Sequence, residues 1–525
     1  LSTGAVSLNS NGSAISLNTV NGAQDFTLTA GTGDIDFNGT VGGTTPLGAV
    51  TITSAGDVTA HTFNAASLVQ TSGTGQTNLA GDVTTSTATG VNITTDNIRL
   101  GGITIDTSAG NGAARFNAPT VLGSNDVTVT AGAGNITFED TLDGGHSLTL
   151  NSSGVERFNG AVGFTTALTS ITTDAPGTVV FNAGSVRTNG AQTYNDAAVL
   201  VSDTSLDGNA ITFASTINGT TAGSQSLSIV DAGQTTLSGA IGGTTALNNL
   251  TVDTAESLQL PATTLAGNLD LTVGNTSTSG NVTQVGALYV GGTTNIVADG
   301  AITLANTSND FVGRVDTLGT AVTLVDSNNL YLGENEATAG SIIMTAGQSI
   351  YNALTLAGYN ITSTAASTLR ANSGVVGTQA APVSVNIPSS KIFAYATGQQ
   401  GNVSIDMSGV TSDDTINLLD TPPGLVIWNG RIINPGQIPG VPQNAWMAAQ
   451  AVLDQYYRTS NGDITLNPPA TVAQDMNNKL YSTEDNLNAI VYGQYVYKFA
   501  PPAQINNGGV KLPAGLDKVS YNNTK

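Results

Sequence analysis

A short motif of phenylalanine followed by asparagine recurs along this chain and constrains its fold more than any other feature. The dipeptide begins at Phe37, Phe63, Phe116, Phe158 and Phe181. Phe138 falls between two of these copies, and neighbouring phenylalanines in the series are 20 to 26 residues apart, or 53 where one copy is missing. A period of this length is typical of solenoids, in which each coil buries its apolar side chains against its neighbours.

A longer match strengthens the evidence for internal repetition. Residues 37–47 (FNGTVGGTTPL), 158–168 (FNGAVGFTTAL) and 237–247 (LSGAIGGTTAL) align without gaps. The offsets of 121 and 79 residues are close to three and two multiples of 40. Because two coils span about that length, we expect two coils to form one higher-order repeat.

The segments between the turn residues have the pattern of short, half-buried strands. Residues 127–130 (VTVT), 148–150 (LTL) and 250–252 (LTV) alternate apolar side chains with threonine. Three such strands and their glycine and asparagine corners fill about 20 residues, and coils stacked at the ~4.8 Å strand spacing pair every backbone with its neighbours. The sequence therefore predicts an all-β chain, a parallel β-helix of about eighteen coils over residues 1–390.

Within such a coil we expect the repeated phenylalanines to stack as an aromatic ladder in the core. The asparagine that follows each of them is expected at a corner with left-handed (αL) backbone geometry, which asparagine tolerates. This interpretation assigns the motif to folding and gives it no role in ligand binding.

The charge of the chain excludes several classes of partner. Only 10% of the 525 residues are charged, against roughly 25% in an ordinary soluble domain, and the net charge is −22. Residues 1–390 contain six arginines, no lysine and 26 acidic residues, whereas all six lysines lie at or after Lys391. Binding to nucleic acid or to an anionic membrane surface needs a basic footprint, so neither is expected. Membrane insertion is not expected either, because no apolar run is long enough to span a bilayer.

Several stretches resemble the repeats of filamentous haemagglutinin-like giant exoproteins and related bacterial β-strand-repeat adhesins. They are residues 302–311 (ITLANTSNDF) and 322–330 (VTLVDSNNL), together with 377–382 (GTQAAP) and 422–430 (PPGLVIWNG), which are similar to the ends of repeat regions. The resemblance covers about residues 1–435. It implies a right-handed β-helix, an outer-membrane secretion partner, and a role in adhesion or biofilm formation at the bacterial cell surface. The absence of cysteine is compatible with export of an unfolded chain.

The composition changes near the end of the repeat region, so we divide the chain into a β-helix repeat region, residues 1–435, and a module, residues 436–525. Helices are predicted from Pro442 to Tyr457 and at 472–480, and a single strand at 488–499, which makes this a small α/β module. It is expected to cap the last coil or to mediate assembly. For assembly, the expected interface residues are Trp446, Tyr492, Tyr495 and Tyr497, because large aromatic residues carry much of the energy of interfaces.

Residues that could carry chemistry are few. Without cysteine, His61 and His146 cannot complete the usual zinc sites, and we expect both at turns or on the surface. The adjacent acid pairs Glu139-Asp140 and Asp413-Asp414 would point to opposite faces of a strand. We therefore expect no catalytic, cofactor-binding or metal-binding residues and no enzyme activity. Weak calcium binding by the 26 acidic residues of the coil region stays open, although their expected role is solubility.

These features predict a non-catalytic, secreted β-solenoid that acts as a surface scaffold or adhesive fibre. Strand-like segments begin near Val6 with no polar cover before them, so we expect the first coil to be covered by upstream sequence or by the aromatic end of another copy, which would give head-to-tail filaments. Host or matrix glycans or proteins are the other expected partners. The rival hypothesis is a polysaccharide-binding or polysaccharide-degrading β-helix.

Overall fold

The computed structural model describes residues 1, 3–274, 280–378, 380–387, 392–396 and 403–406, with short strands beyond them. These residues form a parallel β-solenoid of about 18 turns, as the sequence predicts. They divide into two compact units, Leu1–Asp270 (unit 1) and Leu271–Lys525 (unit 2). The only helical segment that the structure describes is η1, one 3-10 turn at Ser108–Gly110. None of the described helices has the length and hydrophobicity needed to cross a membrane.

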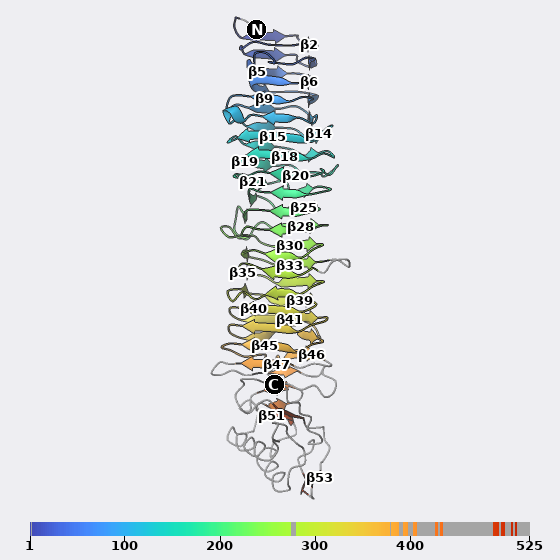
Figure 1. Cartoon of the computed structure of the whole chain (residues 1–525), viewed down its shortest axis with the longest axis vertical. Coiled ribbons are helices and arrows are strands. Elements are labelled where there is room, and N and C mark those ends of the chain that lie inside the picture. The colour runs from blue at the N-terminus through green and yellow to red at the C-terminus, as the bar shows by residue number, and fades with distance from the viewer. Residues whose placement is uncertain are drawn as a thin grey trace. The chain divides into compact units, whose positions relative to one another are not determined.

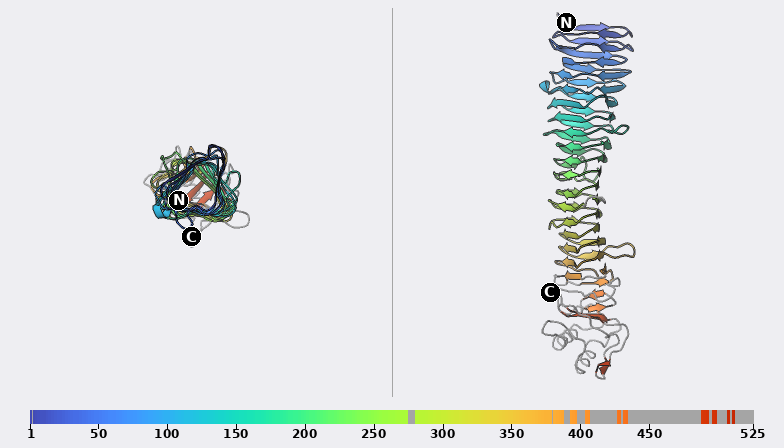
Figure 2. Two further views of the ribbon diagram at one scale, coloured as in Figure 1. Left: turned by 90° about the horizontal axis from the view of Figure 1, so that it is seen from above. Right: turned by 45° about the vertical axis from the view of Figure 1, so that its right-hand side comes forward.

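Each coil of unit 1 consists of short strands joined by tight corners. One coil contains β10 (Val91–Ile93), β11 (Asn97–Leu100) and β12 (Thr104–Asp106), and the next contains β13 (Ala114–Phe116), β14 (Thr120–Leu122) and β15 (Val127–Gly132). The strands of the two coils pair in parallel. In Figures 1 and 2 the blue coils of unit 1 lie one above another around a common centre.

The strands of unit 1 form three ladders, one on each face. The first ladder comprises β1 (Val6–Asn9), β3 (Phe26–Thr29), β5 (Leu47–Ser54), β7 (Phe63–Gln70), β10, β13, β16 (Ile136–Phe138), β19 (Val155–Phe158), β21 (Thr178–Phe181), β24 (Ala197–Leu200) and β27 (Ile217–Gly219). The second comprises β2 (Ile15–Leu17), β4 (Ile35–Phe37), β6 (Val58–Ala60), β8 (Gln76–Leu79), β11, β14, β17 (Leu142–Asp143), β22 (Ser185–Arg187), β25 (Thr204–Gly208), β28 (Leu227–Asp231) and β30 (Leu250–Thr254). The third runs from the start of β7 through β9 (Val83–Thr85), β12, β15, β18 (Leu148–Ser152), β20 (Ile171–Thr173), β23 (Gln192–Tyr194) and β26 (Ile211–Phe213) to β29 (Thr236–Leu237).

Unit 2 repeats this arrangement of parallel ladders. Its longest ladder contains β36 (Thr294–Ala298), β39 (Arg314–Gly319), β41 (Leu330–Ala337), β44 (Ile361–Ser363), β46 (Val383–Asn386) and β48 (Ile405–Asp406). A second contains β34 (Val282–Gln284), β37 (Ile302–Leu304), β40 (Val322–Asp326), β42 (Ile342–Ala346), β45 (Ser367–Ala371) and β47 (Ile392–Ala396). On the remaining side β35 (Leu288–Val290) pairs with β38 (Asp310–Phe311).

The expected aromatic ladder is present in the core of unit 1. Phe116, Phe138, Phe158 and Phe181 occupy equivalent inward positions of the first ladder, and their rings stack with centroids 4.9, 5.9 and 6.2 Å apart. The other two copies lie elsewhere. Phe37 belongs to the second ladder and Phe63 to the third, and their two rings meet edge to face in the core. The repeat therefore places phenylalanine in the core without assigning it to one face.

The asparagines that follow these phenylalanines do not adopt the αL geometry that we expected. Among the described residues other than glycine, positive φ occurs only at Asn11, Asn111 and Ala210. Asn117 and Asn182 instead donate side-chain hydrogen bonds to the asparagines of the preceding coil, Asn92 and Asn159, at 2.7 and 3.2 Å. The prediction was wrong because the side-chain amide finds its hydrogen-bond partner in the preceding coil. The corner therefore does not need a left-handed backbone.

The longer repeated motif encodes a surface loop that inserts residues into a coil. Val41 pairs with Phe63, and Leu47 pairs with Ala65. The chain therefore advances six residues within the motif while the next coil advances only two, and the extra residues form the loop. Leu168 and Leu247 end the other two copies, and both pair with the following coil in the same way. In each copy the backbone amide of the first threonine in the Thr-Thr pair donates a hydrogen bond to an Asn or Asp side chain of the preceding coil; the acceptors are Asn21, Asp143 and Asn218.

One glycine explains why the motif is so similar in its three copies. Gly42, Gly163 and Gly242 have φ of +68°, +69° and +65°. A Cβ atom on any of them would lie 2.0–2.2 Å from a carbonyl oxygen of the next coil. Only glycine can meet both requirements, which are left-handed geometry and the close approach of a neighbouring backbone.

The expected two-coil higher-order repeat is wrong. Val41 lies in the third ladder, Val162 in the second, and Ile241 in the first, so the motif recurs on a different face each time. The offsets of 121 and 79 residues therefore do not correspond to whole numbers of coils. The motif marks a kind of corner, and any face of a coil can carry it.

Beyond the parallel coils the described backbone is antiparallel. β49 (Val426–Trp428) pairs with β50 (Arg431–Ile433) and β51 (Leu487–Tyr492), and β51 pairs with β52 (Tyr495–Lys498). The single strand predicted at 488–499 is therefore wrong: the segment contains two strands, β51 and β52, which pair with each other in antiparallel orientation. The helices predicted at 442–457 and 472–480, and the boundary at residue 435, lie outside the described residues.

Candidate functional site

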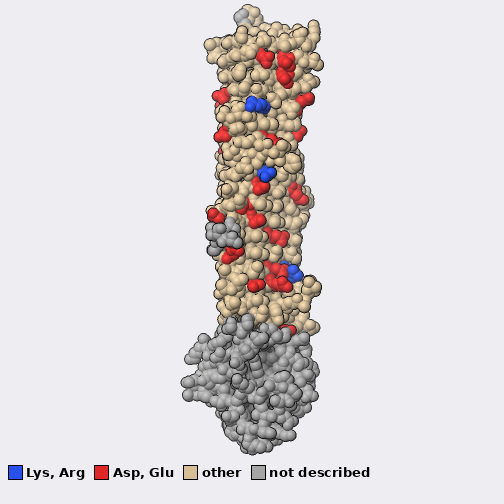
Figure 3. All heavy atoms as spheres, turned by 90° about the vertical axis from the view of Figure 1, so that its right-hand side faces the viewer, with Lys and Arg blue, Asp and Glu red and all other residues tan. Residues whose placement is uncertain are grey.

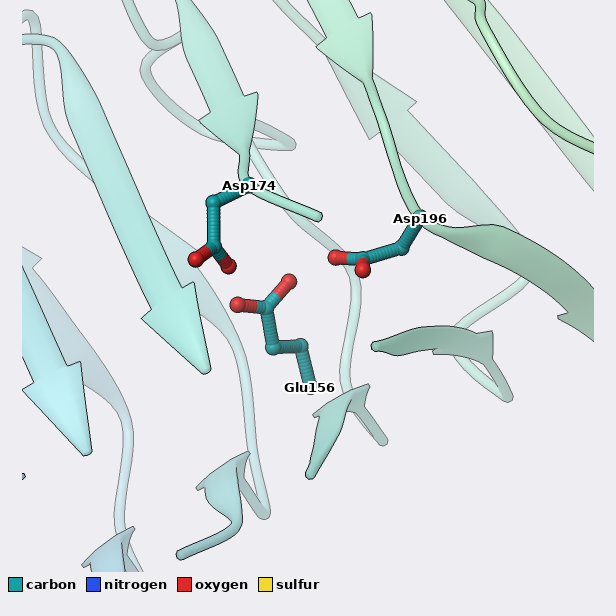
Figure 4. A group of neighbouring side chains, drawn as sticks. All are labelled: Glu156, Asp174 and Asp196. Atoms are coloured by element: carbon teal, nitrogen blue, oxygen red, sulfur yellow. The ribbon is translucent and has the colours of Figure 1, made fainter. Parts of the chain in front are cut away.

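Three carboxyl side chains from successive coils converge at one corner of unit 1. Glu156 lies in β19, Asp174 directly follows β20, and Asp196 directly precedes β24. One ligand oxygen of each lies within 4.8 Å of those of the other two. Figure 4 shows the Glu156 carboxylate between those of Asp174 and Asp196. We call these three residues the carboxylate cluster.

The coil geometry brings the cluster together. Glu156 occupies an inward position of the first ladder, where its neighbours in the adjacent coils are Ile136 and Val179. Asp174 is held at the corner by the backbone amide of Ser152, which donates to its Oδ1 at 2.7 Å. Room for Asp196 exists because residue 177 is glycine: a Cβ atom there would lie 2.6 Å from Asp196 Oδ1.

Two members of the cluster are sealed from solvent without hydrogen-bond partners. Glu156 is 0% exposed and Asp196 is 1% exposed. Both carboxylate oxygens of each residue are buried and receive no hydrogen bond. The hydroxyl of Thr173, which is also 0% exposed, lacks a partner as well. A buried polar atom without a partner costs about 1–3 kcal/mol, and more if it is charged, so these oxygens need a proton or a cation.

Burial dominates the electrostatics of the cluster. It raises the pKa of Glu156 to about 10, with a further contribution from the negative charge of Asp196. Burial also raises the pKa of Asp196, although the neighbouring Glu156 carboxyl and Thr173 hydroxyl act in the opposite direction. The described ion pairs, which are Arg115–Glu139, Arg187–Asp207 and Arg314–Asp316, include no member of the cluster. At neutral pH, Glu156 therefore keeps a proton unless a cation replaces it.

This cluster is not apparent in the sequence, from which we expect no metal-binding residues. The acid pairs noted there are adjacent in the chain, whereas these residues are 18 and 22 positions apart, which is close to one coil each. The signal that could have revealed the cluster is Glu156 itself. In residues 155–158 (VERF) it lies two positions before the ladder phenylalanine, and the equivalent position in 136–138 (ITF) is isoleucine.

The acid pairs and histidines noted in the sequence have structural roles or lie apart from the cluster. Glu139 forms an ion pair with Arg115 at 2.6 Å, and Asp140 accepts a hydrogen bond from the amide of Thr141. His61 is exposed at a corner and His146 is half-buried in a turn, which confirms the expectation for both. The pair Asp413-Asp414 lies outside the described residues.

Unit 2 contains an open groove of about 470 Å³ on the outer faces of β36, β39 and β41. Arg314 and Asp316 form an ion pair in it at 2.7 Å, and Glu334 and Glu336 line its far side. Next to Arg314 in the strand register is Tyr331, which stacks on Tyr351 with ring centroids 5.4 Å apart. The coil register thus brings Arg314 beside three acidic residues, Asp316, Glu334 and Glu336.

The assembly role of the four predicted interface residues stays a prediction, and for three of them the structure describes the backbone. Tyr492 and Tyr495 are directly opposite each other in the β51–β52 hairpin, and Tyr497 is opposite Ile490. The hairpin therefore brings these three tyrosines into one short segment. Trp446 lies outside the described residues, and its role stays a prediction.

Comparison with known proteins gives one match. Residues 247–318 match a family model described as repeats of unknown function (DUF5649). The matched residues include the segment 302–311 that resembles haemagglutinin-like repeats, but the family model carries no such name. No curated protein and no solved structure matches the chain significantly. The chain is thus a β-solenoid protein in which residues 247–318 are similar to repeats of unknown function.

Proposed function

We propose that this chain is a non-catalytic extracellular scaffold or adhesive fibre whose copies stack end to end. The observation that carries the proposal is the stacking of parallel coils within each unit, where each strand of a ladder pairs with the equivalent strand of the next coil. A ladder of this kind does not close on itself, so strands of another copy can extend it.

Another copy of the chain can supply such strands. The β51–β52 hairpin offers tyrosines in a strand segment, and tyrosine is enriched at interfaces. A contact between the first coil of one copy and the last segment of another repeats without closing, which produces a filament.

The side surface supports a scaffold more than an enzyme. On the face shown in Figure 3, most of the surface is uncharged, and acidic side chains outnumber basic ones. The two buried members of the carboxylate cluster are out of reach of a polysaccharide. We therefore propose no enzyme activity, and we keep secretion through an outer-membrane partner and a cell-surface location as parts of the proposal that rest on the resemblance to exoproteins.

The proposal is tested by deleting residues 440–525. Purified intact chain is expected to form filaments in electron micrographs, and the deletion variant is expected to stay as separate particles with the same β-sheet circular dichroism. Filaments that persist unchanged after the deletion would contradict the assembly role of this segment. Separate particles from the intact chain at every concentration would contradict self-assembly itself.

Glycan binding is a second candidate function, and the groove of unit 2 favours it. The groove combines acidic side chains, an arginine and a nearby pair of stacked tyrosines, a combination that can bind sugar hydroxyls and sugar rings. Binding on a glycan array should be lost in Tyr331→Ala, because Tyr331 is the register neighbour of the groove residue Arg314. It should be kept in Tyr289→Ala, because Tyr289 is exposed and pairs with Asp310, outside the groove. Polysaccharide turnover abolished by Glu334→Gln would instead show an enzyme.

A further inference from the structure

We propose that the carboxylate cluster of Glu156, Asp174 and Asp196 is a calcium site built into the core of unit 1. The proposal rests on the convergence of their oxygens within 4.8 Å, on the complete burial of Glu156, and on the inward position that places it among apolar neighbours. It does not depend on the proposed function.

A second observation points to a ligand at this corner. Thr173 is 0% exposed, and its Oγ1 is buried without a hydrogen-bond partner. Its hydroxyl lies beside the Asp196 carboxyl group, whose pKa it acts to lower as a hydrogen-bond partner would. A buried hydroxyl that faces the carboxylate cluster in this way is placed to contribute an oxygen to a cation.

The donor set favours calcium over other common metals. All candidate donors are oxygens, which hard cations prefer, and no described nitrogen or sulfur ligand belongs to the cluster. Calcium binds oxygens at about 2.3–2.6 Å, so two ligands on opposite sides of the ion are about 4.6–5.2 Å apart. Oxygens up to 4.8 Å apart can therefore contact one calcium ion. Magnesium needs about 2.0–2.1 Å and retains several waters, for which two buried carboxylates leave little room.

The sequence makes space for the ion at a cost to ordinary packing. Isoleucine and valine occupy the position of Glu156 in the adjacent coils, at Ile136 and Val179, so an apolar residue fits there and would fill the ladder. Because Gly177 has no side chain, the Asp196 carboxylate can lie against its backbone. With three carboxylates and a divalent ion the site keeps a charge of −1, whereas a trivalent lanthanide would neutralise it. Terbium is therefore a suitable probe.

The test is calcium titration of the intact chain after EDTA treatment and dialysis, measured by calorimetry and by thermal unfolding with and without CaCl₂. We expect one calcium ion per chain at this site and a higher Tm in calcium. Glu156→Gln and Asp196→Asn should weaken binding on the order of 100-fold or more, because each removes a charged ligand. Asp253→Asn removes an exposed acid from β30 of the same unit and should leave binding unchanged.

Glu156→Val separates ligand loss from misfolding. Since valine occupies the equivalent position at 179, this variant should keep the β-sheet spectrum and a Tm that no longer responds to calcium. Tyr194 provides a local reporter, because it pairs in register with Thr173 and lies two residues before Asp196. Terbium luminescence excited through tyrosine should appear in the intact chain and fall in Tyr194→Phe, with calcium affinity retained.

Two results would overturn the proposal. One is a Tm and a heat signal that do not respond to millimolar CaCl₂, in which case a proton alone satisfies the cluster. The other is equal weakening of calcium binding by Asp253→Asn and Glu156→Gln, which would indicate general screening of the negative charge of the chain.

Discussion

The stacked phenylalanines of unit 1 allow a graded prediction about the stability of a single coil. Phe138 is 1% exposed and lies between two rings, with centroids 4.9 Å from Phe116 and 5.9 Å from Phe158. Truncating a buried phenylalanine to alanine costs about 3–5 kcal/mol. Each aromatic pair contributes about 0.5–1.5 kcal/mol of that amount. Phe116 is equally buried but stacks on only one described ring, so Phe116→Ala should cost about 0.5–1.5 kcal/mol less than Phe138→Ala.

Phe164 is the control, since it is 73% exposed in the loop of the second long motif, and Phe164→Ala should change stability by less than about 0.5 kcal/mol. The measurement is guanidinium unfolding, with native-state hydrogen exchange to locate the weakened coils, because a solenoid need not unfold in one step. The expected order of destabilisation is Phe138, then Phe116, then Phe164. Equal effects of Phe138→Ala and Phe164→Ala would refute the core ladder, and equal effects at Phe138 and Phe116 would refute the contribution of stacking.

Other predictions follow from the loop glycines, the corner amides and a buried acid. Gly163→Ala should cost several kcal/mol and expose its loop to limited proteolysis, because the new Cβ would lie 2.1 Å from a carbonyl oxygen at φ +69°; Gly145→Ala, with open space around it, should be neutral. Asn159→Ala removes side-chain bonds to Glu139 and Asn182 and should cost about 1–2 kcal/mol in urea unfolding. Burial raises the pKa of Asp326 from 3.8 to about 6, so folding takes up a proton between these values. The stability of unit 2 should therefore fall by about 3 kcal/mol as the pH rises from 4 to 6 and stay constant above that. Asp326→Asn should flatten this pH profile, and an unchanged profile would show that another group titrates.

Local repetition was sufficient to predict the coil, because a residue that recurs every 20 to 26 positions can be buried in only a few ways. Phe116, Phe138, Phe158 and Phe181 stack as expected. The faces on which Phe37 and Phe63 lie could not be predicted, since an inserted loop changes the number of residues per coil and shifts every later residue around the core.

The same uncertainty in register concealed the carboxylate cluster. Glu156, Asp174 and Asp196 meet only if the intervening corners have the lengths that the structure gives them, and no short-range pattern in the sequence specifies those lengths. The αL prediction for the corner asparagines failed for a different reason. A propensity considers one residue at a time, whereas Asn117 and Asn182 obtain their partners from the coil before them.

Cryo-electron microscopy of the assembled protein can show whether parallel coils continue from one copy to the next in a scaffold. We predict filaments whose length grows with protein concentration and whose power spectrum has a layer line at about 4.8 Å along the filament axis, which is the spacing of paired strands. Separate particles at all concentrations, or filaments without that axial spacing, would contradict this prediction.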